Sequence, residues 1–185
     1  MKTALLVIDV QMALANDDAN GAERSCLEAE SNISILLSEF RKRADTVVHI
    51  HHHGLDPADP FHSEALGSAV QPVAAPIDGE QVYIKHVSSA FSGTKLEIDL
   101  RAKGIERVVT CGATANHCVE SATRAASDLG FDVVYAADAV WAYAVIGPDG
   151  VAHPAEQVHS TSLSTVQGEF ATVLTTEQIL ARQFQ

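Results

Sequence analysis

The stretch RVVTCGATANHCVESATRAASDLGFDVVYA, residues 107–136, contains a strand, a helix and a second strand in immediate succession. Arg107–Cys111 is a short apolar run of the kind found in strands that are buried on both faces. Cys118–Leu129 places small and apolar residues on one helical face, and Gly130 follows as a stop signal. A second apolar run occupies Asp132–Ala136. A strand, a helix and a strand in this order predict a βαβ unit and hence a parallel sheet.

The same alternation continues outward in both directions from this unit. Four further strands are expected at Ala4–Ile8, Thr46–Ile50, Gln81–Ile84 and Ala171–Leu174, and helices at Leu27–Arg43, around Leu96–Leu100 and near Ala155–Gln167. The pattern predicts an α/β fold of the Rossmann-like class, a three-layer α/β/α sandwich around a mostly parallel six-stranded sheet. A length of 185 residues favours one domain over residues 1–185.

The net charge and the cysteine content of the chain indicate which kinds of partner and which compartment to expect. Twenty-four acidic residues against 12 basic ones give a net charge of −12, which disfavours nucleic acid and anionic membrane surfaces. Three cysteines do not form a disulfide framework, and there is no apolar stretch of about 20 residues. We therefore expect a cytoplasmic protein whose partner is a small-molecule substrate.

Three reactive side chains follow predicted strands. Asp9 follows the first, Lys85 the third, and Cys118 opens the helix after the fourth. Ligands of open parallel sheets bind at the carboxyl ends of the strands. The predicted fold therefore brings these three residues to one edge of the sheet.

Cys118 has several possible roles. A position in the first turn of a helix, with Asn116 as a cap, and a nearby lysine would lower the thiol pKa and favour a nucleophile. The alternative is a buried structural thiol. A redox pair with Cys111 is disfavoured because the spacing is not CxxC.

Asp9 and Lys85 also allow two interpretations each. Asp9 is either a surface or capping residue or a general base that accepts the thiol proton. Lys85 is either a solvated strand end or the partner of Asp9. The functional interpretation treats both as one unit with Cys118.

Four segments in order resemble the isochorismatase-like cysteine hydrolases: LLVIDVQ (5–11), KHVSSAFSGTKLEIDLRAKGI (85–105), VVTCGATANHCVESATRAASDLGFDVVYAADA (108–139) and VHSTSLSTVQGEFATVLTTEQIL (158–180). The resemblance implies an isochorismatase-like fold and a catalytic triad of Asp9, Lys85 and Cys118. It also implies a cis peptide between Ala113 and Thr114, an oxyanion hole formed by the N–H groups of Thr114 and Cys118, and a homo-oligomer. Two departures are Ala115, where many members carry threonine, and MALAND after Gln11, where an aromatic residue is common.

The chain carries a histidine run, HIHHHG, after the second predicted strand. Members that bind zinc place an Asp-x-His pair there, and this run has no such pair. Residues 51–53 alternate faces on an extended strand, so they cannot all converge on one ion. We therefore expect no metal and no organic cofactor. Candidate substrate-pocket residues are Gln11, His53, Phe91, His117 and Trp141.

The resemblance and the residues together predict an amidohydrolase. Cys118 would attack the carbonyl of a small-molecule amide, or a related C–N bond, and form a thioester intermediate. Three alternatives remain: cleavage of a vinyl ether, as in true isochorismatases; a binding or redox-sensing protein without turnover; and a zinc amidase.

Overall fold

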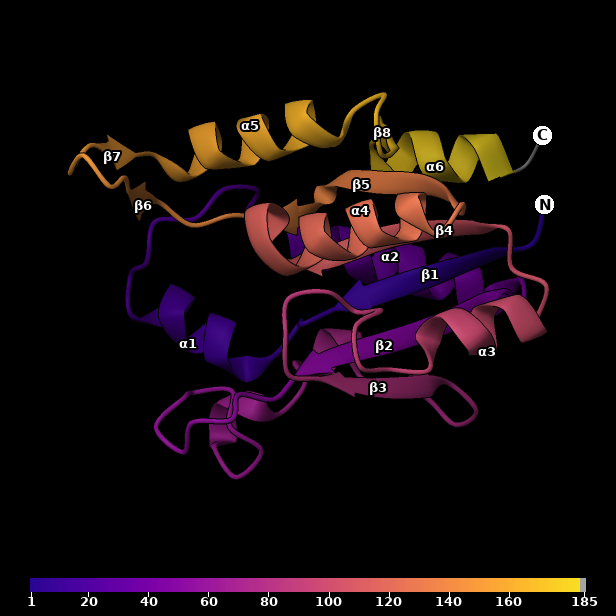
Figure 1. Ribbon diagram of the computed structural model, residues 1–185, viewed down its shortest axis with the longest axis horizontal. Coiled ribbons are helices and arrows are strands. Elements are labelled where there is room, and N and C mark those ends of the chain that lie inside the picture. Colours follow the sequence, from indigo (N-terminus) through magenta and orange to yellow (C-terminus); the bar gives the residue numbers. More distant parts are fainter. Residues whose placement is uncertain (184–185) are drawn as a thin grey trace.

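A six-stranded, all-parallel sheet runs through the centre of the molecule (Figure 1). The structure is a computed structural model that describes residues 1–183. Across the sheet the strands are β3 (Gln81–Lys85), β2 (Thr46–His52), β1 (Thr3–Ile8), β4 (Arg107–Ala113), β5 (Asp132–Trp141) and β8 (Thr172–Leu174). The predicted α/β class and the six predicted strands are confirmed.

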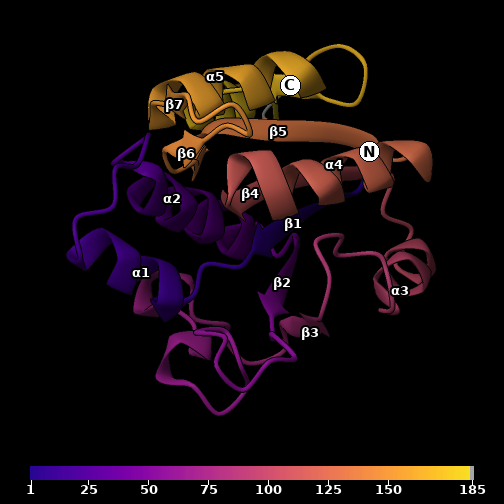
Figure 2. The same ribbon diagram turned by 60° about the vertical axis from the view of Figure 1, so that its left-hand side comes forward.

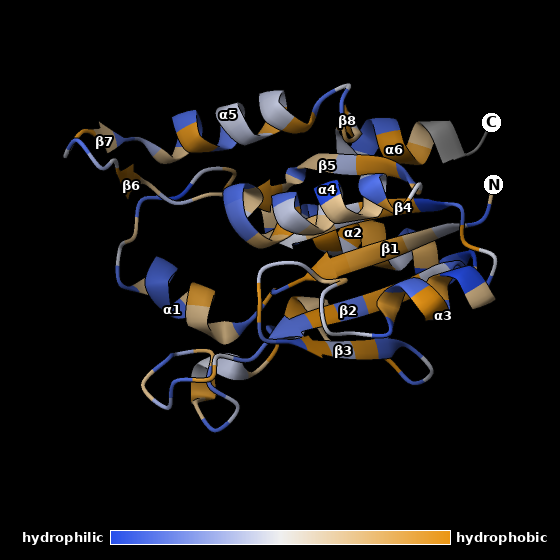
Figure 3. Ribbon diagram, in the orientation of Figure 1, coloured by the Kyte–Doolittle hydropathy of each residue, from blue (hydrophilic) through white to orange (hydrophobic). Residues whose placement is uncertain are grey.

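β1 shows why the strands read as continuous apolar runs. Ala4, Leu6 and Ile8 pack into the core on one face of the sheet, and Leu5 and Val7 pack into the core on the other. Both faces of the strand are covered, so the side chains that point to either face can be apolar. Figure 3 shows β1 as hydrophobic along nearly its whole length.

Helices cover both faces and form the expected three layers (Figure 2). α3 (Leu96–Ala102), α4 (Glu120–Asp128) and α5 (Ala155–Val166) pack on one face, and α2 (Ala29–Lys42) and α6 (Thr176–Gln183) pack on the other. No helix within residues 1–183 is both long and apolar enough to cross a bilayer.

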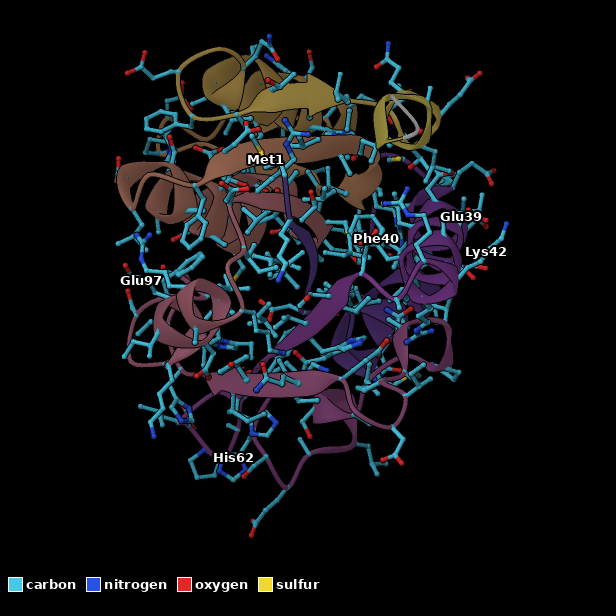
Figure 4. The ribbon with its side chains drawn as sticks, turned by 90° about the vertical axis from the view of Figure 1, so that its right-hand side faces the viewer. Met1, Glu39, Phe40, Lys42, His62 and Glu97 are labelled. Atoms are coloured by element: carbon cyan, nitrogen blue, oxygen red, sulfur yellow. The ribbon has the colours of Figure 1, made fainter. Side chains whose placement is uncertain are left out.

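α2 has the amphipathic pattern that its sequence predicts. Its buried side chains include Ile33, Leu36, Leu37 and Phe40. Figure 4 shows Phe40 directed toward the sheet and Lys42 directed away from it. The apolar spacing of three and four residues thus fixes which face of the helix meets the sheet.

Several elements were not predicted. A helix α1 (Met12–Ala19) follows β1, and a short hairpin joins β6 (Val145–Ile146) to β7 (Ala152–His153). The segment between β2 and β3 is a long loop, as predicted, with two 3₁₀ turns. β5 continues five residues beyond the predicted end at Ala136, to Trp141.

The strand order reverses between β1 and β4. The chain runs outward from β1 to β2 and β3, then crosses back to β4 and continues outward through β5 and β8. Parallel sheets bind ligands at the carboxyl ends of the strands beside such a reversal. Asp9 follows β1 and Cys118 follows β4, so both lie at the reversal.

Gly112 allows the ends of β1 and β4 to approach closely. Its φ is +113°, and a Cβ placed on it would lie 2.0 Å from the carbonyl oxygen of Ile8. Any larger residue would force the two strand ends apart, just before Asp9 on one strand and Ala113 on the other.

Gly112→Ala is expected to lower the free energy of unfolding by roughly 3–5 kcal/mol, because a backbone clash adds to an unfavourable φ. Gly79→Ala is the matched control: Gly79 also has a positive φ, +89°, but nothing lies within 4 Å of its added Cβ. Denaturant unfolding of both variants measures the difference. Equal losses in the two variants would contradict the close approach of the strands.

Candidate active site

Asp9 is held just beyond the end of β1 in an unusual backbone conformation. Its φ is +52°, and its N–H donates to the carbonyl of Ile50 at 2.9 Å. The residue is only 3% exposed. A carboxylate this deeply buried needs a partner, because unpaired burial of a charge is costly.

Lys85, the last residue of β3, provides that partner. Its side chain is fully buried, and its Nζ lies 2.7 Å from Asp9 Oδ2. The alternative of a solvated strand end is therefore wrong for Lys85. The second carboxylate oxygen, Asp9 Oδ1, is buried and has no hydrogen-bond partner among the described residues.

Cys118 completes the cluster. The peptide bond between Ala113 and Thr114 is cis, and the chain then forms a π-helical turn, Ala115–Val119, before α4 begins. Lys85 Nζ donates to Cys118 Sγ at 3.2 Å. One ammonium group thus contacts both the carboxylate and the thiol.

The local helix geometry at Cys118 differs from the prediction. Thr114, not Asn116, occupies the cap position, and no side chain caps the turn. The cysteine lies fourth in the π-helical turn, and α4 starts only at Glu120. Sequence periodicity cannot separate a π-helical turn from the first turn of an α-helix.

The electrostatics of the thiol also differ from the prediction. Burial, reinforced by the negative charge of Asp9, raises the pKa of Cys118 to about 12, and Lys85 only partly opposes this. Burial likewise raises the pKa of Asp9, again opposed by Lys85. The thiol is therefore neutral in the resting site, and it needs a base in order to react.

A cavity of about 160 Å³ opens onto these groups. It is lined by Asp9, Leu14, His52, Phe61, Ala113, Thr114, His117 and Cys118. His117 therefore lies where it was predicted, in the cavity beside Cys118. None of the lining residues is a lysine or arginine.

His52, rather than His53, reaches the site. The β2–β3 register pairs His52 with Lys85, and His52 Nδ1 lies 3.3 Å from Lys85 Nζ. His53 does not line the cavity. His51 points to the opposite side of the strand, where its ring centroid lies 6.4 Å from that of His49.

Three other predicted pocket residues lie elsewhere. Trp141 is fully buried in the core, and Arg24 stacks on its ring at 4.4 Å. Phe91 packs against Phe131, with ring centroids 6.1 Å apart, outside the cavity lining. Gln11, the third of these residues, does not line the cavity either.

Gln11 forms hydrogen bonds with both backbone groups of His52. Its Oε1 accepts from the His52 N–H at 2.8 Å, and its Nε2 donates to the His52 carbonyl at 3.0 Å and the Ser68 carbonyl at 2.8 Å. The side chain is fully buried, so it cannot touch a substrate. Gln11 instead holds the end of β2 and the following loop beside the cavity.

Metal-ligating side chains do not converge here. Within residues 1–183, no group of three or more His, Cys, Asp and Glu side chains is arranged to hold a metal ion. The chemistry available to the cavity is that of a thiol, a carboxylate, an ammonium and two imidazoles.

Comparison with known proteins identifies the family of the chain. The family model for the isochorismatase domain matches residues 3–178. The isochorismatase family protein YrdC of Bacillus subtilis is 38% identical over 179 residues, 97% of this chain and 95% of YrdC. A crystal structure of an isochorismatase-family protein from Chromobacterium violaceum superposes with a TM-score of 0.93 at 35% identity, covering 97% of this chain and 92% of the other.

A shorter match involves an enzyme with a named activity. N-carbamoylsarcosine amidase from Arthrobacter sp. is 35% identical over 75 residues, which is 40% of this chain and 28% of the amidase. The matches over nearly the whole length are those that assign the family. The chain belongs to the isochorismatase family and is a hydrolase of that family.

Proposed function

We propose that the protein is a cysteine hydrolase that cleaves the C–N bond of a small, neutral amide through a thioester intermediate. One observation carries the proposal: Lys85 Nζ contacts both Asp9 Oδ2 and Cys118 Sγ, while Asp9 Oδ1 is left without a partner. This arrangement supplies a nucleophile, a base with a free oxygen, and a fixed cation.

The first half of the reaction acylates the cysteine. Asp9 Oδ1 accepts the Cys118 proton as the thiol attacks the amide carbonyl. The N–H groups of Thr114 and Cys118 stabilise the tetrahedral oxyanion. Asp9 then gives the proton to the departing nitrogen, which leaves as ammonia or an amine, and the acyl group remains on Sγ as a thioester.

The second half restores the enzyme. Asp9 takes a proton from a water molecule, whose oxygen attacks the thioester carbonyl. The carboxylic acid leaves, and the Cys118 thiol is reprotonated from Asp9. Lys85 holds the Asp9 carboxylate in place throughout and stabilises the sulfur when it carries negative charge.

The cavity favours a small, neutral substrate over a large or anionic one. A volume of about 160 Å³ is below the roughly 300–1,000 Å³ of sites for drug-sized ligands. Lys85 is already paired with Asp9, and the lining contains neither lysine nor arginine to pair with a substrate carboxylate. The amidase relative also acts on a C–N bond, as its name states.

Substrate screening with mass spectrometry tests the proposal. Small primary amides are incubated with the enzyme, ammonia release is measured, and the intact protein is examined after acid quenching. We expect ammonia release and an acyl adduct on the peptide containing Cys118. Pyruvate release from a vinyl ether without such an adduct would instead establish the isochorismatase reaction, and no turnover of either class would favour a binding or sensing role.

The pH profile gives a second test. Asp9 must be ionised to accept the thiol proton, and burial raises its pKa above the ordinary value of 3.8. Activity should therefore be present above this raised pKa and be lost as the pH falls through it. We expect the acid limb of kcat/KM to lie above pH 3.8.

Tryptophan fluorescence provides the control for that profile. Trp141 is the only tryptophan and is fully buried, so its emission reports unfolding directly. The emission should stay constant across the acid limb. A limb that coincides with a shift in emission would reflect acid unfolding rather than titration of Asp9.

A further inference from the structure

The contacts of His52, a residue that lines the cavity, determine which of its ring nitrogens carries the proton. Lys85 Nζ has three neighbours that accept hydrogen bonds: Asp9 Oδ2 at 2.7 Å, Cys118 Sγ at 3.2 Å and His52 Nδ1 at 3.3 Å. An ammonium group has three N–H donors and no acceptor. His52 Nδ1 must therefore present its lone pair to Lys85.

The proton of the neutral ring consequently lies on Nε2. That nitrogen has no hydrogen-bond partner among the described residues and is not one of their buried unpaired side-chain atoms, so it is open to solvent, and His52 is one of the residues that line the cavity. The ring is fixed in orientation on one side by its edge-to-face contact with Phe61, with centroids 5.7 Å apart.

The backbone of His52 is fixed as well. Gln11 bonds both its N–H and its carbonyl, and the next N–H, that of His53, donates to the Lys85 carbonyl at 2.9 Å. Protonation of the ring is disfavoured, because burial and the charge of Lys85 both lower the pKa of His52. The titratable groups that act on the ring are Lys85, Asp9, Asp59 and His86, in decreasing order of effect.

We propose that His52 is a substrate-binding residue whose Nε2–H donates a hydrogen bond to a second acceptor on the substrate, next to the amide under attack. The inference rests on the proposed function and deepens it: the preferred substrates are small neutral amides that carry an ether, hydroxyl or carbonyl oxygen besides the reacting carbonyl. Substrates with an ammonium at that position are rejected, because a donor would face a donor.

Two substitutions separate the roles of the two ring nitrogens. His52→Asn keeps an acceptor close to the place of Nδ1, for Lys85, but does not reach the cavity. His52→Gln extends an amide N–H to the place of Nε2. The probes are methoxyacetamide and butanamide, which differ by one ether oxygen in place of a methylene group.

With wild-type enzyme we expect KM to be lower for methoxyacetamide than for butanamide. His52→Asn should raise KM for methoxyacetamide about 5- to 20-fold, the effect of one lost hydrogen bond, and change KM for butanamide less than twofold. His52→Gln should recover most of the loss. Equal changes for both amides in His52→Asn would show a merely structural role and overturn the proposal.

Nitrogen-15 NMR of histidine-labelled protein tests the ring without any turnover. The His52 signals are assigned by their loss in His52→Asn. We expect an unprotonated Nδ1 and a protonated Nε2 between pH 6 and 8, and the opposite tautomer or an imidazolium would overturn the proposal. If wild-type enzyme hydrolyses no amide, the proposed function fails, whereas this spectrum still decides the state of His52.

Discussion

Cys118→Ser should abolish amide hydrolysis, with kcat falling by roughly 10⁴-fold or more, the size seen when a nucleophile is removed from a triad. The thiol already has a pKa raised to about 12, and Asp9 is the base that we propose for it. A serine hydroxyl is a weaker acid still, so the same carboxylate cannot deprotonate it at a useful rate.

The fold should survive this substitution. Cys118 is only partly buried, and its sulfur accepts a hydrogen bond from Lys85. A hydroxyl can accept the same bond. We expect the midpoint of thermal unfolding to change by no more than a few degrees, so that the loss of activity cannot be ascribed to unfolding.

Cys26→Ser is the matched control. Cys26 is also partly buried, its sulfur hydrogen-bonds to the carbonyl of Asp138, and it lies outside the cavity lining. It should retain wild-type kcat and KM. Amide turnover by Cys118→Ser at more than about a hundredth of the wild-type rate would remove Cys118 from the role of nucleophile.

The edge at which the site forms could be predicted from sequence because it depends on topology alone. Apolar runs that alternate with amphipathic helices require parallel strands, and parallel strands place Asp9, Lys85 and Cys118 at their carboxyl ends. No detail of side-chain packing enters that argument. The same reasoning gave the correct strands and the correct buried face of α2.

The side chains around the cavity could not be predicted in the same way. Whether His52 or His53 faces the site depends on which alternate residues of β2 point to that side of the sheet. Residues 46–50 (TVVHI) carry apolar side chains in both alternating sets, so the sequence does not decide between them. Trp141 was misplaced because β5 continues past Ala136 after a shift in its register with β4, and the indole packs into the core.

Gln11 illustrates a second limit. Its role depends on hydrogen bonds to His52 and Ser68, which lie 41 and 57 residues away in sequence. Local pattern cannot reveal such a contact. The raised pKa of Cys118 could not be predicted for a similar reason. The sequence showed only the position of the cysteine near a helix start, whereas the pKa is set mainly by burial in the folded protein.

Asp9→Asn should reduce kcat by roughly 10²–10⁴-fold, the usual contribution of a general base. The amide has nearly the same shape as the carboxylate and offers Lys85 an oxygen, but it cannot accept the thiol proton. The substitution also leaves the fully buried Lys85 ammonium without a counter-charge. Breaking a buried pair in this way destabilises a protein by roughly 3–5 kcal/mol.

Loss of stability and loss of chemistry can be separated by removing both charges. Lys85→Met alone should also destabilise the fold, since Asp9 is then buried without a partner. The double variant Asp9→Asn/Lys85→Met contains neither charge, so its free energy of unfolding should be higher than that of either single variant. Its kcat should stay as low as that of Asp9→Asn.

The cycle of four proteins decides between two roles for the Asp9–Lys85 pair. If the pair only holds the fold together, the double variant should regain activity as it regains stability, because Cys118 is intact. If Asp9 moves the proton, stability returns and activity does not. Denaturant unfolding and kcat for the same four proteins measure both, and destabilisations that simply add in the double variant would contradict a direct interaction between the two charges.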